Sequence, residues 1–276
     1  MAPRPLRILT ALLAVAVASG AQAQAPDRGA APAVGIAAEP GFLGPGWRVS
    51  LGAGALLRPD YPGSSDYDVT PIPFLEVVWN DRVFATTRQG AEVGVFLTRD
   101  RAFRSGIALD YAFGRDQDDN ARLKGLGDID GTVRGRLFAS SGIGPFTLSA
   151  FLAQDLANNG HGLTVGADLE YRLRLSPRLS VFGGPGLTWA NDTHMETFFG
   201  VSQAQAARSA AGLPRYDAGA GVRDVRFTLG ALALITDSIF LQPRVIVSEL
   251  VGDAADSPLT TSETQVTAFL IGGIRF

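Results

Sequence analysis

The sequence predicts an all-β protein, a transmembrane antiparallel up-and-down β-barrel of about 12 strands that follows a cleaved signal peptide. Three observations predict this fold. Several long segments alternate apolar and polar residues, the N-terminus carries an export signal, and the chain ends on Phe276 at the close of an alternating segment. A large soluble β-sandwich or a lipocalin-like barrel is the alternative, and it would use shorter strands with the apolar face inward.

The composition excludes several classes of protein. The 276 residues include 33 Gly and 16 Pro, so turns are frequent and long helices are few. The chain lacks the repeated runs of about 20 apolar residues that a helical membrane protein needs. Charged residues make up 18% and are spread along the chain, which argues against disorder and against a nucleic-acid partner. The absence of cysteine excludes disulfides, thiolate metal sites and a cysteine nucleophile.

The N-terminal region is predicted to serve export. In residues 1–23, two arginines precede a short apolar stretch, and Ala21-Gln22-Ala23 forms a signal-peptidase cleavage site. Cleavage would leave Gln24 as the mature N-terminus. Residues 24–45 are rich in Ala, Pro and Gly and are expected to form a flexible periplasmic leader, which leaves 46–276 for the barrel.

Residues 162–175 show the clearest alternation. Every odd position from Leu163 to Leu175 is apolar or aromatic, whereas the even positions carry Gly, Thr, Asp, Glu and Arg. Fourteen residues exceed the length of about 9–11 that a tilted transmembrane strand needs. Weaker forms of the pattern occur in 47–58, 107–114, 128–139 and 265–276. These segments favour strands with one face toward lipid and the other toward a polar lumen.

Twelve strands are predicted in total, an even number as expected for a single-chain bacterial barrel. They are 46–58, 71–79, 82–88, 91–98, 104–115, 126–140, 144–156, 162–175, 179–190, 226–235, 238–250 and 265–276. If both termini lie in the periplasm, the long connectors all fall outside the cell. In an alternative count, 82–98 forms a single strand and residues 215–224 supply the missing one.

Charged residues on the polar faces of two predicted strands are expected to line the lumen. These candidates are Asp128, Asp130, Arg134, Arg136, Asp168, Glu170, Arg172 and Arg174. Opposite charges on facing strands would pair and fill a narrow bore, while arginine rows would suit an ion-selective pore. The aromatic residues Trp47, Trp79, Trp189 and Tyr171 lie near strand ends, where the interfacial girdles of barrels occur.

Catalysis and metal binding are not expected. The two histidines, His161 and His194, fall in connectors and are predicted to be solvated, and no G-x-S-x-G motif is present. Acidic residues cluster at 116–120 and 253–256 without the spacing of a calcium loop. These carboxylates are expected to be solvated, and divalent cations of lipopolysaccharide could bridge them. No metal or cofactor is therefore assigned.

Several motifs resemble those of the MipA/OmpV family of outer-membrane proteins. They are Leu51-Gly52-Ala53-Gly54, Arg58 to Asp66, Pro71-Ile72-Pro73, Gly114-Arg115-Asp116, Leu123 to Asp128, Phe199 to Ser202, Gln205-Ala206 with Tyr216, and Gly252 to Leu259. They occur in the family order across 46–276. Family members often end in an aromatic pair, whereas this chain has Arg275 before Phe276.

The resemblance implies an outer-membrane protein that contacts lipid, lipopolysaccharide and the barrel assembly machinery, for which Phe276 would be the assembly signal. It also implies a scaffold that binds a murein-degrading lytic transglycosylase and a bifunctional murein synthase. Other members of the family are porin-like or adhesive surface proteins. A barrel by itself implies none of these roles.

Overall fold

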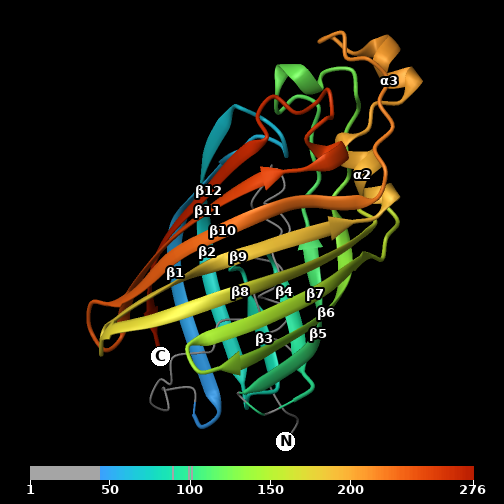
Figure 1. Cartoon of the computed structure of the whole chain (residues 1–276). Coiled ribbons are helices and arrows are strands. Elements are labelled where there is room, and N and C mark those ends of the chain that lie inside the picture. Colours follow the sequence, from blue (N-terminus) through green and yellow to red (C-terminus); the bar gives the residue numbers. More distant parts are fainter. Residues whose placement is uncertain (1–43, 89, 99, 101) are drawn as a thin grey trace, which may run out of the picture.

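The computed structural model describes residues 44–88, 90–98, 100 and 102–276. The predicted signal peptide, and the leader up to residue 43, lie outside the described residues. Twelve antiparallel strands close into one barrel in which each strand pairs with its neighbours in sequence and β1 pairs with β12 (Figure 1). This confirms the predicted up-and-down barrel.

The strands differ greatly in length. They are β1 (Trp47–Pro59), β2 (Tyr67–Trp79), β3 (Val83–Thr86), β4 (Glu92–Phe96), β5 (Phe103–Ala112), β6 (Thr132–Ile143), β7 (Phe146–Asp155), β8 (Leu163–Ser176), β9 (Leu179–Ala190), β10 (Gly221–Leu234), β11 (Ile239–Leu250) and β12 (Thr264–Arg275). Because β3 and β4 are two separate strands, the alternative count with one strand over 82–98 is wrong.

The largest error in the predicted boundaries concerns β6. The alternating pattern predicted a strand from residue 126, but β6 begins at Thr132. Gly125 and Gly127 have φ of +90° and +81°, a conformation that suits glycine and interrupts an extended strand. These glycines exclude a strand that starts at 126. Ile129 still pairs with Arg115 through an isolated bridge, but continuous pairing with β5 begins only at Thr132. At β10 the error is opposite, since the strand begins five residues earlier than predicted, at Gly221.

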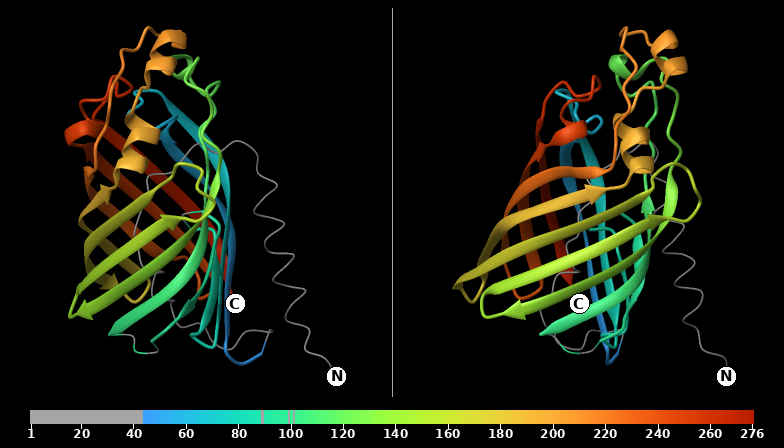
Figure 2. Two further views of the ribbon diagram at one scale, coloured as in Figure 1. Left: turned by 90° about the vertical axis from the view of Figure 1, so that its right-hand side faces the viewer. Right: turned by 45° about the vertical axis from the view of Figure 1, so that its right-hand side comes forward.

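The two ends of the barrel are built differently (Figure 2). One end, here called the loop end, carries the connectors 60–66, 113–131, 156–162, 191–220 and 251–263. The other, the turn end, carries short connectors such as 144–145 and 177–178. The connectors predicted to be long thus all lie at one end. Helices α2 (Asp192–Phe199) and α3 (Gln203–Arg208) belong to the loop end, and among the described residues no helix is long and apolar enough to cross a membrane.

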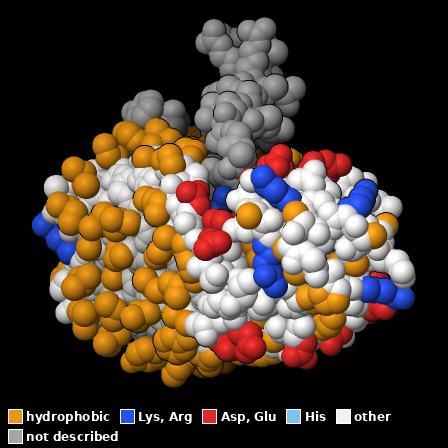
Figure 3. Space-filling model, turned by 90° about the horizontal axis from the view of Figure 1, so that it is seen from above, with side chains coloured by type: hydrophobic (Ala, Val, Ile, Leu, Met, Phe, Trp, Pro, Cys, Tyr) orange, Lys and Arg blue, Asp and Glu red, His pale blue; other side chains and the backbone are white. Residues whose placement is uncertain are grey.

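The outer face of the barrel is apolar. Exposed large hydrophobic side chains occupy alternate positions of most strands, for example Leu137, Leu148, Leu169, Leu173, Phe227, Leu229, Val245, Val247 and Leu270. Seen from the loop end, such side chains cover one side of the molecule, while charged side chains gather around the loops (Figure 3). An apolar outer belt around a polar interior is the pattern of a barrel embedded in lipid.

Aromatic side chains mark the edges of this belt. Trp47 and Trp79 lie opposite each other at the turn end of β1 and β2, with ring centroids 6.0 Å apart. Tyr171 lies near Phe146, also at the turn end, with centroids 5.2 Å apart. Trp189 lies near the opposite end of the wall, one residue from the loop end of β9. These positions suit the two interfacial girdles predicted from the sequence.

Glycine on one strand and phenylalanine on the next fill much of the interior. The cross-strand pairs are Gly94 with Phe84, Gly106 with Phe138, Gly166 with Phe151, Gly230 with Phe182, and Gly273 with Phe240. A Cβ at any of these glycines would lie within 2.1–2.7 Å of the ring of its phenylalanine. The rings therefore cover these glycines and fill the space beside them inside the barrel.

The half of β2 nearest the loop end is a strand edge that no other strand pairs with on one side. β2 pairs with β1 over its whole length but with β3 only over Glu76–Trp79. The Leu75 carbonyl accepts from the Thr87 N–H, and the Leu75 N–H donates to the Thr87 hydroxyl, so the backbone groups of Leu75 point away from β1. Because backbone groups alternate sides along a strand, the N–H groups on the side away from β1 belong to odd-numbered residues of β2. Two of these residues are Pro71 and Pro73, which have no N–H. Proline at an open edge blocks pairing with another strand.

Phe276 continues the pairing of β12 with β1. Its N–H donates to the Val49 carbonyl at 2.8 Å, so the register places Phe276 beside Val49 on the outward face. We expect deletion of Phe276 to reduce the amount of barrel in the outer membrane, because it removes the last apolar contact and the terminal aromatic residue. Immunoblots of membrane fractions would measure this, and equal amounts for both chains would contradict it.

Candidate functional site

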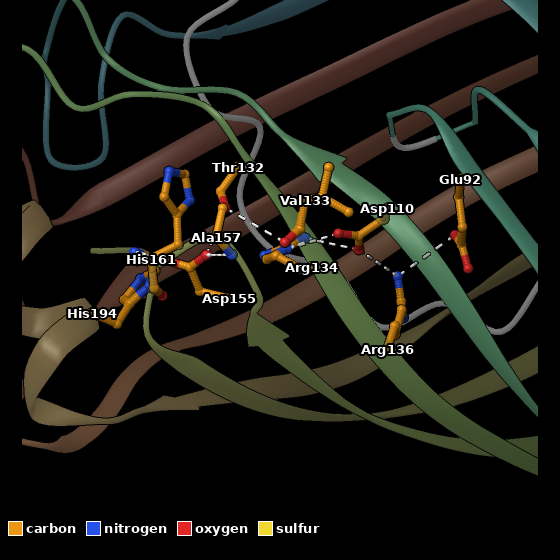
Figure 4. Close-up of polar contacts among 10 residues, drawn as sticks. All are labelled: Glu92, Asp110, Thr132, Val133, Arg134, Arg136, Asp155, Ala157, His161 and His194. Carbon is orange, nitrogen blue, oxygen red and sulfur yellow. Dashed lines mark hydrogen bonds and ion pairs between the residues drawn. The ribbon is translucent and has the colours of Figure 1, made fainter. Parts of the chain in front are cut away.

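A network of ion pairs crosses the interior between β4, β5 and β6 (Figure 4). Arg134 forms a bidentate pair with Asp110, with its Nε and Nη2 donating to the two carboxylate oxygens at 2.8 and 2.9 Å. Arg136 lies 3.7 Å from Glu92 and 3.9 Å from Asp110. All four side chains are largely buried, so each charge has a partner of opposite sign nearby.

A second network joins β8 to β10 across β9. Arg226 donates to both oxygens of Asp168 at 2.9 Å and to Asp224 at 3.1 Å. The Asp168 carboxylate passes over Gly186, where a Cβ would lie 2.1 Å from its Oδ1. Arg223 pairs with Asp224 at 2.8 Å. A glycine on the intervening strand is thus what allows these charges to meet.

Six of the eight lumen charges predicted from the sequence face the interior. Arg134, Arg136, Asp168, Glu170, Arg172 and Arg174 share the inward register of β6 and β8. Asp128 and Asp130 do not line the lumen, because both are exposed in the loop 113–131, where Asp128 accepts from the Gln117 N–H. The alternation of β6 continues through both residues, but in this segment only Ile129 pairs with a neighbouring residue.

Other inward charges escaped the sequence analysis. Five charged residues lie in or beside the lumen: Arg88, Arg226, Arg244, Glu76 and Glu92. Four of them take part in its ion pairs, whereas Arg244 stacks on Phe182. Their local sequences alternate weakly, so only the pairing with a neighbouring strand reveals the face on which they lie. The sequence of one strand does not specify its register against the neighbouring strands, and that register is what would have identified these residues.

Arginine side chains also stack on the inward phenylalanines. The guanidinium carbon lies 4.6 Å from the ring centroid for Arg104 over Phe96 and 4.7 Å for Arg136 over Phe151. Arg172 and Arg244 share Phe182, at 4.7 and 5.2 Å. Cation–π contacts of this kind hold arginines against the wall and narrow the bore further.

The connectors at the loop end pack into a structure here called the loop cap, made of residues 60–66, 113–131, 156–162, 191–220 and 251–263. Two apolar clusters form its core, one around Phe198 and Phe199 and the other around Tyr61 and Leu123. Hydrogen bonds join distant loops, since the Tyr61 hydroxyl donates to the Leu259 carbonyl at 3.0 Å and the Asn120 amide donates to Asp60 at 2.9 Å. The loops thus pack against one another over the loop end.

The two histidines are buried in this cap, which corrects the prediction that they are solvated. His161 is 1% exposed and His194 is 2% exposed. A carbonyl only accepts, so His161 Nε2 donates to the Asp130 carbonyl and His194 Nδ1 donates to the His161 carbonyl. His194 Nε2 then accepts from Arg223 at 3.1 Å. The histidines therefore link the cap to the ion pairs of the barrel wall.

Burial shifts the ionisation of two residues in the cap. Desolvation lowers the pKa of Arg115 to about 10, although nearby Tyr61, Asp119 and Asp128 oppose that change. Desolvation also raises the pKa of Tyr61 above its usual value. Both shifts reflect a water-poor interior of the cap.

The acidic clusters of the loops are organised by the backbone. Asp116 and Asp119 accept from backbone N–H groups of each other's segment, and Asn120 caps the short helix η1 (Ala121–Leu123). Across the described ranges, no group of three or more His, Asp or Glu side chains could hold a metal ion.

The fold and the sequence are similar to those of known proteins. An outer membrane channel from Pseudomonas putida F1 matches with a TM-score of 0.50 and 14% identity, over 90% of this chain and 100% of that one. The outer membrane protein OprD from Pseudomonas aeruginosa matches with a TM-score of 0.38 and 13% identity, over 84% of this chain and 65% of that one. No curated protein matches the sequence. The family described as MltA-interacting protein MipA matches residues 51–276, so this outer-membrane barrel protein belongs to the MipA family.

Proposed function

We propose that the protein is a scaffold for the peptidoglycan machinery, without enzymatic activity of its own. The observation that carries this proposal is the extent of the family match, which covers residues 51–276 and therefore the barrel itself. The family is described by its interaction with MltA, and the resemblance implies a lytic transglycosylase and a bifunctional murein synthase as partners. The barrel wall and its turns would then carry the interaction.

The geometry supports a scaffold in two ways. Ion pairs and stacked rings occupy the bore, and the loop cap covers one end, so the structure is well suited to act as a rigid support. Enzymes that act on peptidoglycan lie in the periplasm, where both termini are expected. The turn end and the leader 24–45 are then the parts of the chain that such enzymes can reach.

Two exposed ion pairs at opposite ends allow a controlled test. Arg178 pairs with Asp237 at the turn end and Arg215 pairs with Asp217 in the loop cap, and both arginine side chains are 59% exposed. We expect Arg178→Glu to weaken binding of a purified lytic transglycosylase by about fivefold, a change of roughly 1 kcal/mol, and Arg215→Glu to leave it unchanged.

Binding to immobilised barrel at physiological salt would measure this difference. If wild-type barrel retains neither the transglycosylase nor the murein synthase, the scaffold proposal is wrong. If both charge reversals weaken binding equally, the interface does not lie at the turn end.

A diffusion channel is the second candidate, favoured by the positively charged side chains that line the bore at Arg172, Arg174 and Arg244. With the bore so filled, we expect low or intermittent conductance in planar bilayers. Steady, large single-channel currents that rise on Arg172→Ala, with no murein enzyme retained, would make the channel the better description.

A further inference from the structure

Four inward residues form one cross-strand row in the half of the wall nearer the turn end. Arg172 on β8 lies opposite Phe182 on β9, Phe182 opposite Gly230 on β10, and Gly230 opposite Arg244 on β11. The ring of Phe182 occupies the space above Gly230, where a Cβ would lie 2.5 Å from its Cζ. The two guanidinium groups therefore both lie against this one ring.

The charges around this row do not balance. Arg88 pairs with Glu76, Arg172 pairs with Glu170 at 2.7 Å, and Arg226 pairs with Asp168 at 2.8 Å. Arg244 alone of these four arginines has no hydrogen bond or ion pair with any described residue. Its Nε is buried without a partner. The charges that act on it are the like charges of Arg88 and Arg172 and the opposite charges of Glu170 and Asp168, which are already paired with Arg172 and Arg226.

Two buried arginines of the loop end also have an Nε without a partner, but the charges around them differ from those around Arg244. The charges that act on Arg58 are those of Asp68, Asp119 and Asp60, all of opposite sign. Arg115 similarly lies near Asp119 and Asp128. Arg244 instead lies in a part of the lumen where each neighbouring carboxylate already has its own arginine. Arg244 is half-buried, and a guanidinium with a buried N–H that has no acceptor is costly to the fold and attracts an anion.

We propose that Arg244 binds the anionic group of a small carboxylate- or phosphate-bearing solute inside the lumen. A guanidinium presents planar N–H donors that match the oxygens of these two groups. Gln242, two residues away on the same face of β11, accepts from Arg88 at 3.4 Å through Oε1 and keeps amide donors for the same anion. Arg88 and Arg172 would supply further positive charge. This site does not depend on the scaffold role.

Calorimetric titration of the folded barrel in detergent micelles tests the proposal, with sodium phosphate and sodium acetate as separate probes at constant ionic strength. We expect at least one anion to bind, and the stronger one identifies the preferred group. Because charged hydrogen bonds contribute strongly to binding, Arg244→Gln should weaken the affinity about tenfold or more. Arg215→Gln removes an equal charge from an exposed part of the loop cap and should bind like wild type.

The stability of the ligand-free barrel gives a second readout. If Arg244 serves a ligand, Arg244→Gln should unfold at the same temperature as wild type or higher, because it relieves repulsion from Arg88 and Arg172. The proposal is overturned if neither anion binds wild type, or if Arg244→Gln and Arg215→Gln bind equally. A lower unfolding temperature with unchanged binding would likewise overturn it, since Arg244 would then serve only to pack Phe182.

Discussion

Leu169→Arg is expected to destabilise the barrel in a lipid bilayer by about 2–4 kcal/mol, the cost of a charge on the lipid face near mid-membrane. Leu169 is the seventh of the 14 residues of β8, and its side chain is 40% exposed on the outer face. Refolding into lipid vesicles, followed by the folded fraction on unheated gels, would measure the loss.

Glu170→Gln is the matched control, because Glu170 is the next residue and faces the interior. Its pair with Arg172 is partly exposed, with side chains 27% and 41% accessible, so loss of that charge should have little effect. If the two variants fold equally well, the assignment of faces in β8 is wrong.

Asp168→Ala is expected to cost about 3 kcal/mol of folding free energy, because it removes the bidentate partner of Arg226. The Arg226 side chain is 2% exposed, so water does not replace the lost carboxylate. Asp224 and Thr188 would still accept from its Nη1, at 3.1 and 2.7 Å. Denaturant unfolding in micelles or vesicles would give the difference.

Asp237→Ala provides the comparison for this variant. It also removes the carboxylate partner of an arginine, Arg178, but in an exposed turn where the Asp237 side chain is 90% accessible. Stability close to wild type is expected there. Similar losses in Asp168→Ala and Asp237→Ala would mean that the β8–β10 network does not stabilise the fold through burial.

The alternation of apolar and polar residues was sufficient to predict the barrel and most of its strands. It works because lipid on one side and the lumen on the other impose a period of two on every long strand. It failed before β6, where Asp128 and Asp130 continue the pattern into a loop. There the positive φ of Gly125 and Gly127 breaks the extended backbone, and after it only Ile129 pairs with a neighbour before Thr132. Local alternation carries no information about either fact.

The contents of the lumen and the cap were less predictable, because they depend on residues far apart in the chain. His161 and His194 have polar flanking sequences, yet Phe198 packs against both rings and Arg223 donates to one of them. Likewise, the contact of Arg244 with Phe182 depends on the register of β9, β10 and β11. Such contacts follow from strand pairing and loop packing, which one sequence does not specify.

The shortness of β3 and β4 has a mechanical consequence. Four residue pairs join β2 to β3, four join β3 to β4, and five join β4 to β5, whereas 13 join β1 to β2. These three short strand pairings follow one another, so the wall from β2 to β5 should be the part of the barrel that deforms most easily. When lateral pressure in the bilayer changes, the cross-section should deform here first, while the arc from β5 to β1 keeps its shape.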